Sequence, residues 1–320
     1  MEPTVSDRPT DQGARRSGAL RRRGQSTPPA RSWSPWWIPA AIAGYLLLAY
    51  AVIWAVDVRR VFGDPAQLQE AGLDPPLMWV QLFMDGGLTE LIQWSMLAAI
   101  VILAAGLGAR HRGEAASYPS NERSAHLGVF WTLVAVMAAL MLIEDAGNPR
   151  HLLRHYAGLV GGVDSNLDRP VETLYFGAIA SIGVYAFLRH GRDLIAIPTV
   201  RVLGALGAGL YALAVVMSAA RSVGGFYLAL GGWLIDDVLR VPMIVDEVMV
   251  SYLAVFELDL RFFFVDFVIE ESLEVLGAAF LLAAVVAYRR RAVGSTPGSA
   301  RGREAEDPRP ADPTSAQRTL

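Results

Sequence analysis

Residues 268–288 have the sequence VIEESLEVLGAAFLLAAVVAY and are followed directly by Arg289-Arg290-Arg291. The stretch begins with Glu270, Glu271 and Glu274 and continues as an almost uninterrupted apolar run. About 20 residues at 1.5 Å rise each are long enough, as a helix, to cross the roughly 30 Å hydrocarbon layer of a bilayer. The stretch therefore predicts a membrane-spanning helix with carboxylates at one end and arginines at the other.

The composition of the whole chain favours the same class of protein. Its 320 residues are 53% hydrophobic, the mean hydropathy is +0.35, and the apolar residues come in long blocks. These features predict an all-α, polytopic transmembrane helical bundle. The absence of cysteine excludes disulfides, Cys-ligated zinc, iron–sulfur clusters and thiol nucleophiles. Every basic side chain is arginine, which indicates a GC-rich genome and a bacterial source.

Six apolar runs of spanning length are predicted, arranged as three helical hairpins. They cover residues 36–56, 88–109, 126–143, 171–188, 202–220 and 268–288. Short apolar pieces in the outer loops, such as 77–83, are predicted to lie on the membrane interface. Whether 226–256 spans or lies on the surface stays open, because Asp246 and Glu247 would each cost about 2.5–3.5 kcal/mol inside the bilayer.

The distribution of arginine predicts the orientation. Residues 1–32 and 292–320 are polar and arginine-containing, and are expected to be disordered cytoplasmic tails on a bundle at 33–291. Arginines gather on the inner side when both termini are cytoplasmic, as the positive-inside rule requires. The first helix is interpreted as uncleaved, because no small-residue cleavage site follows it. We expect a bacterial inner (plasma) membrane protein whose arginine side contacts anionic lipid, and we expect no nucleic-acid partner.

Carboxylates at the outer helix ends are the candidate site. Glu274 is the first choice, because it lies one helical turn from both Glu270 and Glu271, and like charges at that spacing repel. A shared proton, a bound cation or an arginine would offset the repulsion. Ionisable groups within a span are functional candidates because their burial is costly. The full candidate set is Glu274, Glu271, Glu270, Glu90, Glu172, Glu144 and Asp145.

Two histidines after the third predicted span suggest a metal site. His151 and His155 are four residues apart on a possible helix and could face one divalent ion, with Glu144 or Asp145 supplying oxygen. The competing interpretation is that the interleaved arginines pair with nearby acids and the histidines lie in the polar interface. The cofactor is therefore unknown, with a divalent metal possible.

Small residues predict where helices approach closely. Gly204, Ala208 and Ala212 recur every four residues, and Gly277 with Ala278 lies one turn below the last glutamate of the final span. Small residues at such positions allow the backbones of membrane helices to come into contact.

Three functions fit these features. The first is cation or proton binding or transport through the outer carboxylates. The second is a membrane-embedded metal-dependent hydrolase or lipid-modifying enzyme that uses His151 and His155. The third is a structural or accessory protein whose outer loop, 221–267, docks an envelope protein. The chain has no phosphate-binding glycine loop, dinucleotide fingerprint or nucleophile elbow.

Overall fold

A computed structural model gives the architecture of residues 34–63, 65–72, 78–84, 86–147, 149, 152, 153, 156, 168–221, 225–238 and 260–294. This part of the chain is helical and has no strand, so the all-α prediction is confirmed for it. The predicted tails up to residue 32 and from 295 onward lie outside the described residues, as does 239–259 in the outer loop. Helix α13 continues to Gly294, three residues beyond the predicted end of the bundle.

The long helices are α1 (Trp37–Ile53), α4 (Leu88–Ser117), α5 (Glu122–Gly147), α7 (Asp168–His190), α9 (Pro198–Ala220) and α13 (Glu271–Gly294). The short helices are α2 (Pro65–Glu70), α3 (Met78–Phe83), α8 (Arg192–Ile195), α10 (Phe226–Gly232) and α12 (Leu260–Phe263). Within the described residues, the π-helical segments are η1 (Trp54–Val58), η2 (Trp233–Val238) and η3 (Phe264–Glu270). The short helices α2, α3, α10 and α12 occur in the predicted outer loops, whereas α8 lies in a predicted inner connection. The location of the outer short helices at the membrane interface stays a prediction.

Four described stretches are long and apolar enough to cross a membrane. They are Trp37–Val58, Gln81–Ser117, Glu122–Gly147 and Pro198–Ala220. They correspond to the first, second, third and fifth predicted spans, which supports a multi-pass membrane protein. The two remaining predicted spans coincide with the helices α7 and α13, whose crossing of the bilayer stays a prediction. The inner-membrane location and the cytoplasmic termini also stay predictions.

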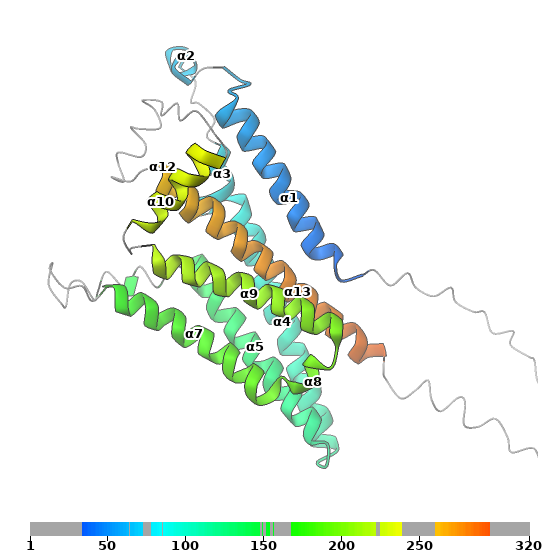
Figure 1. Cartoon of the computed structure of the whole chain (residues 1–320). Coiled ribbons are helices and arrows are strands. Elements are labelled where there is room, and N and C mark those ends of the chain that lie inside the picture. The colour runs from blue at the N-terminus through cyan, green and yellow to red at the C-terminus, as the bar shows by residue number, and fades with distance from the viewer. Residues whose placement is uncertain are drawn as a thin grey trace, which may run out of the picture. The chain divides into compact units, whose positions relative to one another are not determined.

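Helix α13 packs against three other long helices. It contacts α9, α4 and α1, and Figure 1 shows it between α1 and α9. Val275, Ala278, Ala279 and Ala283 on α13 have no exposed surface. Alanines at these positions leave room for neighbouring helices on several sides of α13, because a methyl group is the smallest side chain that still fills the contact.

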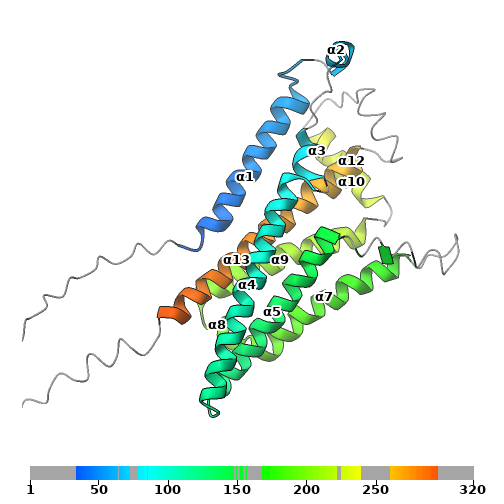
Figure 2. The ribbon, with the colours of Figure 1, turned by 180° about the vertical axis from the view of Figure 1, so that it is seen from behind.

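The predicted arrangement as three hairpins is not confirmed. Helix α4 packs most extensively against α5, and α5 also packs against α7, as Figure 2 shows from behind. Helix α1 packs against α13 and not chiefly against α4, its predicted hairpin partner. Interhelical hydrogen bonds of α1 include Tyr45 to Thr89 of α4 at 2.8 Å and Tyr50 to Ser272 of α13 at 2.6 Å. The predicted hairpin partners α5 and α7, and α9 and α13, are in contact, whereas α1 lies chiefly against α13.

Two glycines set the crossing of α9 and α13. A Cβ atom on Gly207 would lie 2.9 Å from the carbonyl oxygen of Gly277, and one on Gly277 would lie 2.7 Å from Cδ2 of Tyr211. The role predicted for Gly277 is thus confirmed. The predicted seam on α9 is wrong, because a Cβ on Gly204 would meet nothing within 4 Å and the two alanines of that seam are exposed. The buried face of α9 lies one residue away and includes Gly207.

The arginine-bearing helix ends lie together. Arg110 of α4 donates to the carbonyl oxygen of Ala292 in α13 at 3.1 Å, and Tyr288 of α13 contacts His111 of α4 at 2.9 Å. His126 near the start of α5 contacts the last residue of α7 at 2.9 Å. Helices α4 and α13 therefore run in the same direction, with the start of α5 and the end of α7 in contact at this end of the bundle.

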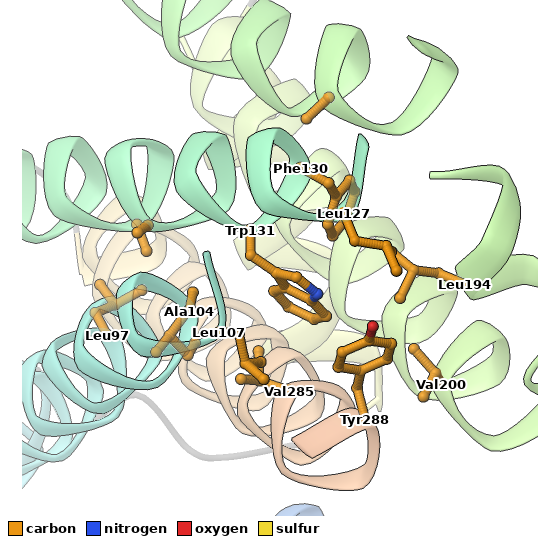
Figure 3. Close-up of a cluster of buried hydrophobic side chains, with 14 residues drawn as sticks. Leu97, Ala104, Leu107, Leu127, Phe130, Trp131, Leu194, Val200, Val285 and Tyr288 are labelled. Carbon is orange, nitrogen blue, oxygen red and sulfur yellow. The ribbon is translucent and has the colours of Figure 1, made fainter. Parts of the chain in front are cut away.

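An aromatic and aliphatic core fills the space next to this arginine end. The rings of Trp131 and Tyr288 have centroids 4.7 Å apart, and Leu107 and Val285 belong to the same buried cluster (Figure 3). The cluster holds α4, α5 and α13 together by apolar contact. The opposite ends of these same three helices are joined by polar side chains instead.

Candidate functional site

Gln93 in the second turn of α4 joins two carboxylates from different helices. Its side chain is only 1% exposed. Its Nε2 donates to Oδ2 of Asp145 at 2.6 Å and to Oε2 of Glu274 at 2.9 Å. The two carboxylate oxygens therefore lie within about 5.5 Å of each other, the sum of those distances. That separation is inside the range of about 4–6 Å over which charges affect each other's protonation.

Two further side chains belong to this place. Tyr211 of α9 interacts electrostatically with Asp145, Glu274 and Glu271. Glu271 interacts with Glu274 and Asp145 in the same way. We call Gln93, Asp145, Tyr211, Glu271 and Glu274 the Gln93 site. It draws residues from α4, α5, α9 and α13, which are separated by long stretches of sequence.

Three polar atoms of the Gln93 site are buried and have no hydrogen-bond partner among the described residues. They are Oε1 of Gln93, the hydroxyl of Tyr211 and Oε2 of Glu271. Polar atoms in protein interiors are nearly always hydrogen-bonded, and leaving one unsatisfied costs about 1–3 kcal/mol. A proton on Glu271 would convert one of these acceptors into a donor. The site thus has unused capacity for a ligand that donates hydrogen bonds or is itself a proton.

The charge of the Gln93 site is its second property. Three acids meet one neutral amide and one neutral phenol, so the fully ionised site would carry three negative charges. Buried like charges at this separation are strongly unfavourable unless protons or cations neutralise them. Glu271 and Glu274 continue the helix of α12 and η3 without a break, so they have no free N–H groups of a helix N-terminus beside them. The helix dipole therefore does not stabilise three unneutralised carboxylates at this place.

Glu90 and Glu270 flank the Gln93 site. Glu90 is 7% exposed, accepts a hydrogen bond from the backbone N–H of Gly86 and interacts electrostatically with Glu271. Glu270 is 8% exposed and accepts a hydrogen bond from the hydroxyl of Tyr227. Both acids were predicted as site residues. The structure places them beside the Gln93 site, each with a partner of its own.

Other outer carboxylates are accounted for differently. Glu144 precedes Asp145 at the end of α5 and is 5% exposed. Asp57 accepts hydrogen bonds from the backbone N–H groups of Met78 and Trp79 at 3.0 and 2.9 Å, so it caps the start of α3. The side chain of Glu172 lies outside the described residues.

The predicted metal site falls outside the described part of the chain. His151 and His155 are not described, so a divalent metal at these histidines stays a prediction. Among the residues that the structure does describe, no group of three histidine, aspartate or glutamate side chains is placed to hold a metal ion. The docking of an envelope protein on 221–267 and the contact with anionic lipid also stay predictions.

The sequence interpretation missed the two uncharged members of the site. Gln93 stands in an otherwise apolar part of α4, three residues after Glu90 and thus on the same helix face. A buried amide within a span commonly makes an interhelical hydrogen bond. Tyr211 lies in the middle of α9, away from the interfacial positions that tyrosine prefers. A polar side chain at either position could have predicted polar contacts between helices inside the bundle.

No known protein family, curated protein or solved structure matches this chain. Its function must therefore be inferred from the side chains of the Gln93 site and their surroundings.

Proposed function

We propose that this multi-pass membrane protein binds and exchanges protons at the Gln93 site, with Glu274 and Asp145 sharing a proton. The observation that carries the proposal is the contact of one buried amide nitrogen with both carboxylates, at 2.9 and 2.6 Å. A shared proton removes one negative charge from the pair without requiring further ligands. Two acids held close together commonly share a proton for this reason.

Each residue has a definite part in this proposal. The amide of Gln93 holds the two acids in place and donates to whichever oxygen is ionised. Glu271 is the third acid and the next group to take up a proton, since its Oε2 has no partner among the described residues. Tyr211 supplies a hydroxyl that can donate to an ionised acid or accept from a protonated one. A proton can thus move within the site while every step conserves charge.

The test uses the full chain in lipid vesicles with a pH-sensitive dye inside. After an imposed pH step, wild-type protein is expected to speed the equilibration of protons. Removing a proton-transfer group commonly costs about 10²-fold or more in rate. Glu274→Gln and Asp145→Asn are therefore expected to slow proton equilibration by at least about tenfold, even where another acid takes over part of the transfer. Glu70→Gln is the matched control, because Glu70 is an exposed carboxylate on α2.

Two results would overturn the proposal. One is equal proton exchange by wild type and both site variants, which would mean that these acids only cap or brace helices. The other is sodium uptake, driven by a sodium gradient, that wild type supports and Glu274→Gln does not, while the pH-sensitive dye reports no proton exchange in either protein. That outcome would assign the same oxygens to a monovalent cation.

A further inference from the structure

We propose that protons reach the Gln93 site along a ladder of three carboxylates, Asp266, Glu270 and Glu274, and that Tyr227 is the positioning residue of the middle rung. This inference rests on the proposed proton exchange at the Gln93 site and supplies its route. The rungs lie in η3 and the first turn of α13, and they are spaced four residues apart.

The spacing brings the three acids onto one side of the helix. At the α-helical rise of about 1.5 Å per residue, the step from Glu270 to Glu274 covers roughly 6 Å along the helix axis, and the step within η3 is shorter because a π-helix is wound more widely. Glu270 interacts electrostatically with both Asp266 and Glu274. The charge on each of these carboxylates therefore affects the protonation of its neighbour. The first two rungs lie in the π-helical segment η3, and π-helical turns are frequent at functional sites because they change which side chains face one another.

Asp266 is the outer rung. Arg221, which follows the last residue of α9, donates from Nη1 to Oδ1 of Asp266 at 3.1 Å. The two side chains are 20% and 14% exposed, so both are partly accessible from outside the bundle. Ser218 holds the same guanidinium through Nη2 at 3.2 Å. An adjacent arginine favours the ionised carboxylate, so Asp266 passes a proton on more readily than it keeps one.

Glu270 is the middle rung. Tyr227 of α10 has no exposed surface and donates its hydroxyl hydrogen to Oε2 of Glu270. Val265 packs beside this tyrosine in the same buried apolar cluster. The hydrogen bond fixes the orientation of the carboxyl group and leaves the other oxygen to take up a proton. Besides Tyr227, the charged groups that act on Glu270 include Glu274, Asp266, Arg221 and Glu271.

The inner end of the ladder is where unpartnered atoms gather. The side chain of Gln93 is only 1% exposed, and its Oε1 has no hydrogen-bond partner among the described residues. Oε2 of Glu271 is also buried and has no hydrogen-bond partner there. The ladder therefore ends at a place with hydrogen-bonding capacity still to be used, which distinguishes it from a row of acids that only pair with surface arginines.

The proton balance along the ladder is simple. A proton from water binds Asp266, then moves to Glu270 and leaves Asp266 ionised. It next moves to Glu274, and Glu270 returns to its carboxylate form. One proton advances at each step and nothing is oxidised or reduced. A helical turn is about 5.4 Å, so a water molecule or a hydroxyl group bridges each transfer.

The experiment separates the rate of proton transfer from the capacity of the site. We measure the rate with the vesicle assay above and the equilibrium titration of carboxyl groups by infrared absorption of the purified full chain. Glu270→Gln is expected to slow exchange at least about tenfold while the titration of the Asp145–Glu274 pair persists. Glu270→Asp restores an acid at the middle rung and is expected to recover part of the rate.

Tyr227→Phe tests the positioning role and is also the safeguard if Glu270→Gln fails to fold. Loss of the hydroxyl donor disfavours ionised Glu270, so the pH profile of the exchange rate is expected to move to higher pH. Tyr118→Phe is the control, because Tyr118 is 69% exposed. Wild-type rates in both Glu270→Gln and Tyr227→Phe would overturn the ladder and leave the Gln93 site in place. A wild-type protein with no titrating carboxyl pair would overturn the proposed function itself.

Discussion

Replacement of Gln93 by leucine removes the donor that Asp145 and Glu274 share while keeping a buried side chain of similar volume. Each carboxylate loses one hydrogen bond, formed at 2.6 and 2.9 Å. Hydrogen bonds to charged groups contribute about 1.5–3 kcal/mol, and one pH unit corresponds to about 1.36 kcal/mol. The pair should therefore titrate about one to two pH units higher in Gln93→Leu than in wild type.

The same change should reduce stability. Interhelical hydrogen bonds in membrane proteins contribute on average about 0.6 kcal/mol and at most about 1.7. Loss of the two bonds that link α4 to α5 and α13 should therefore cost roughly 1–3 kcal/mol. This range is below the total stability of a typical folded protein, about 5–15 kcal/mol, so we expect the variant to fold and to be available for titration.

The assay is an infrared pH titration of the carboxyl absorption, with Gln81→Leu as control because Gln81 of α3 is exposed. Gln93→Glu serves as a second variant. It replaces the donor by a carboxyl of nearly the same shape and should bind one additional proton at neutral pH. A midpoint in Gln93→Leu that is unchanged, or that moves to lower pH, would refute the reasoning that the amide favours the ionised acids.

Two further predictions concern packing and pH. Gly207→Ala should lower the free energy of unfolding in detergent by about 1–3 kcal/mol, because the new Cβ would lie 2.9 Å from a backbone oxygen of α13. Gly204→Ala is the control and should be neutral or slightly stabilising, because a Cβ there would meet nothing within 4 Å. Equal effects of the two changes would contradict the observed crossing of α9 and α13. Partial burial, the charge of His126 and the charge of Arg189 lower the pKa of His190 below 6.5. The unfolded chain then binds more protons, so stability should fall as pH drops from 6.5 toward the folded pKa. His190→Gln should flatten that slope in melting curves recorded on both sides of the window, and an unchanged slope would count against the histidine pair.

The sequence was sufficient for features that depend on local composition. Long apolar runs marked four stretches that are long and apolar enough to cross a membrane. Glu274 and Asp145 were selected from their positions at helix ends, and both accept a hydrogen bond from one amide nitrogen, while their role in binding an ion stays a prediction. These features follow from the high cost of burying charge and from the length of a bilayer, and neither requires knowledge of which helices touch.

Features that depend on how helices rotate against one another were missed. The predicted seam through Gly204 is one residue away from the face of α9 that α13 covers, which corresponds to a rotation of about 100°. Hairpin pairing failed for α1, which packs mainly on α13, because the sequence does not show which helix faces fit together. Gln93 and Tyr211 were overlooked because an uncharged polar residue in an apolar run gains significance only when its partners from other helices are known.

The most direct test of the central claim is the infrared spectrum of the purified wild-type chain at neutral pH, compared with Glu274→Gln and Asp145→Asn. A proton shared inside the Gln93 site predicts a protonated-carboxyl absorption in wild type that both variants alter and Glu70→Gln does not. A wild-type spectrum with every carboxyl ionised, or an absorption indifferent to both variants, would contradict the account.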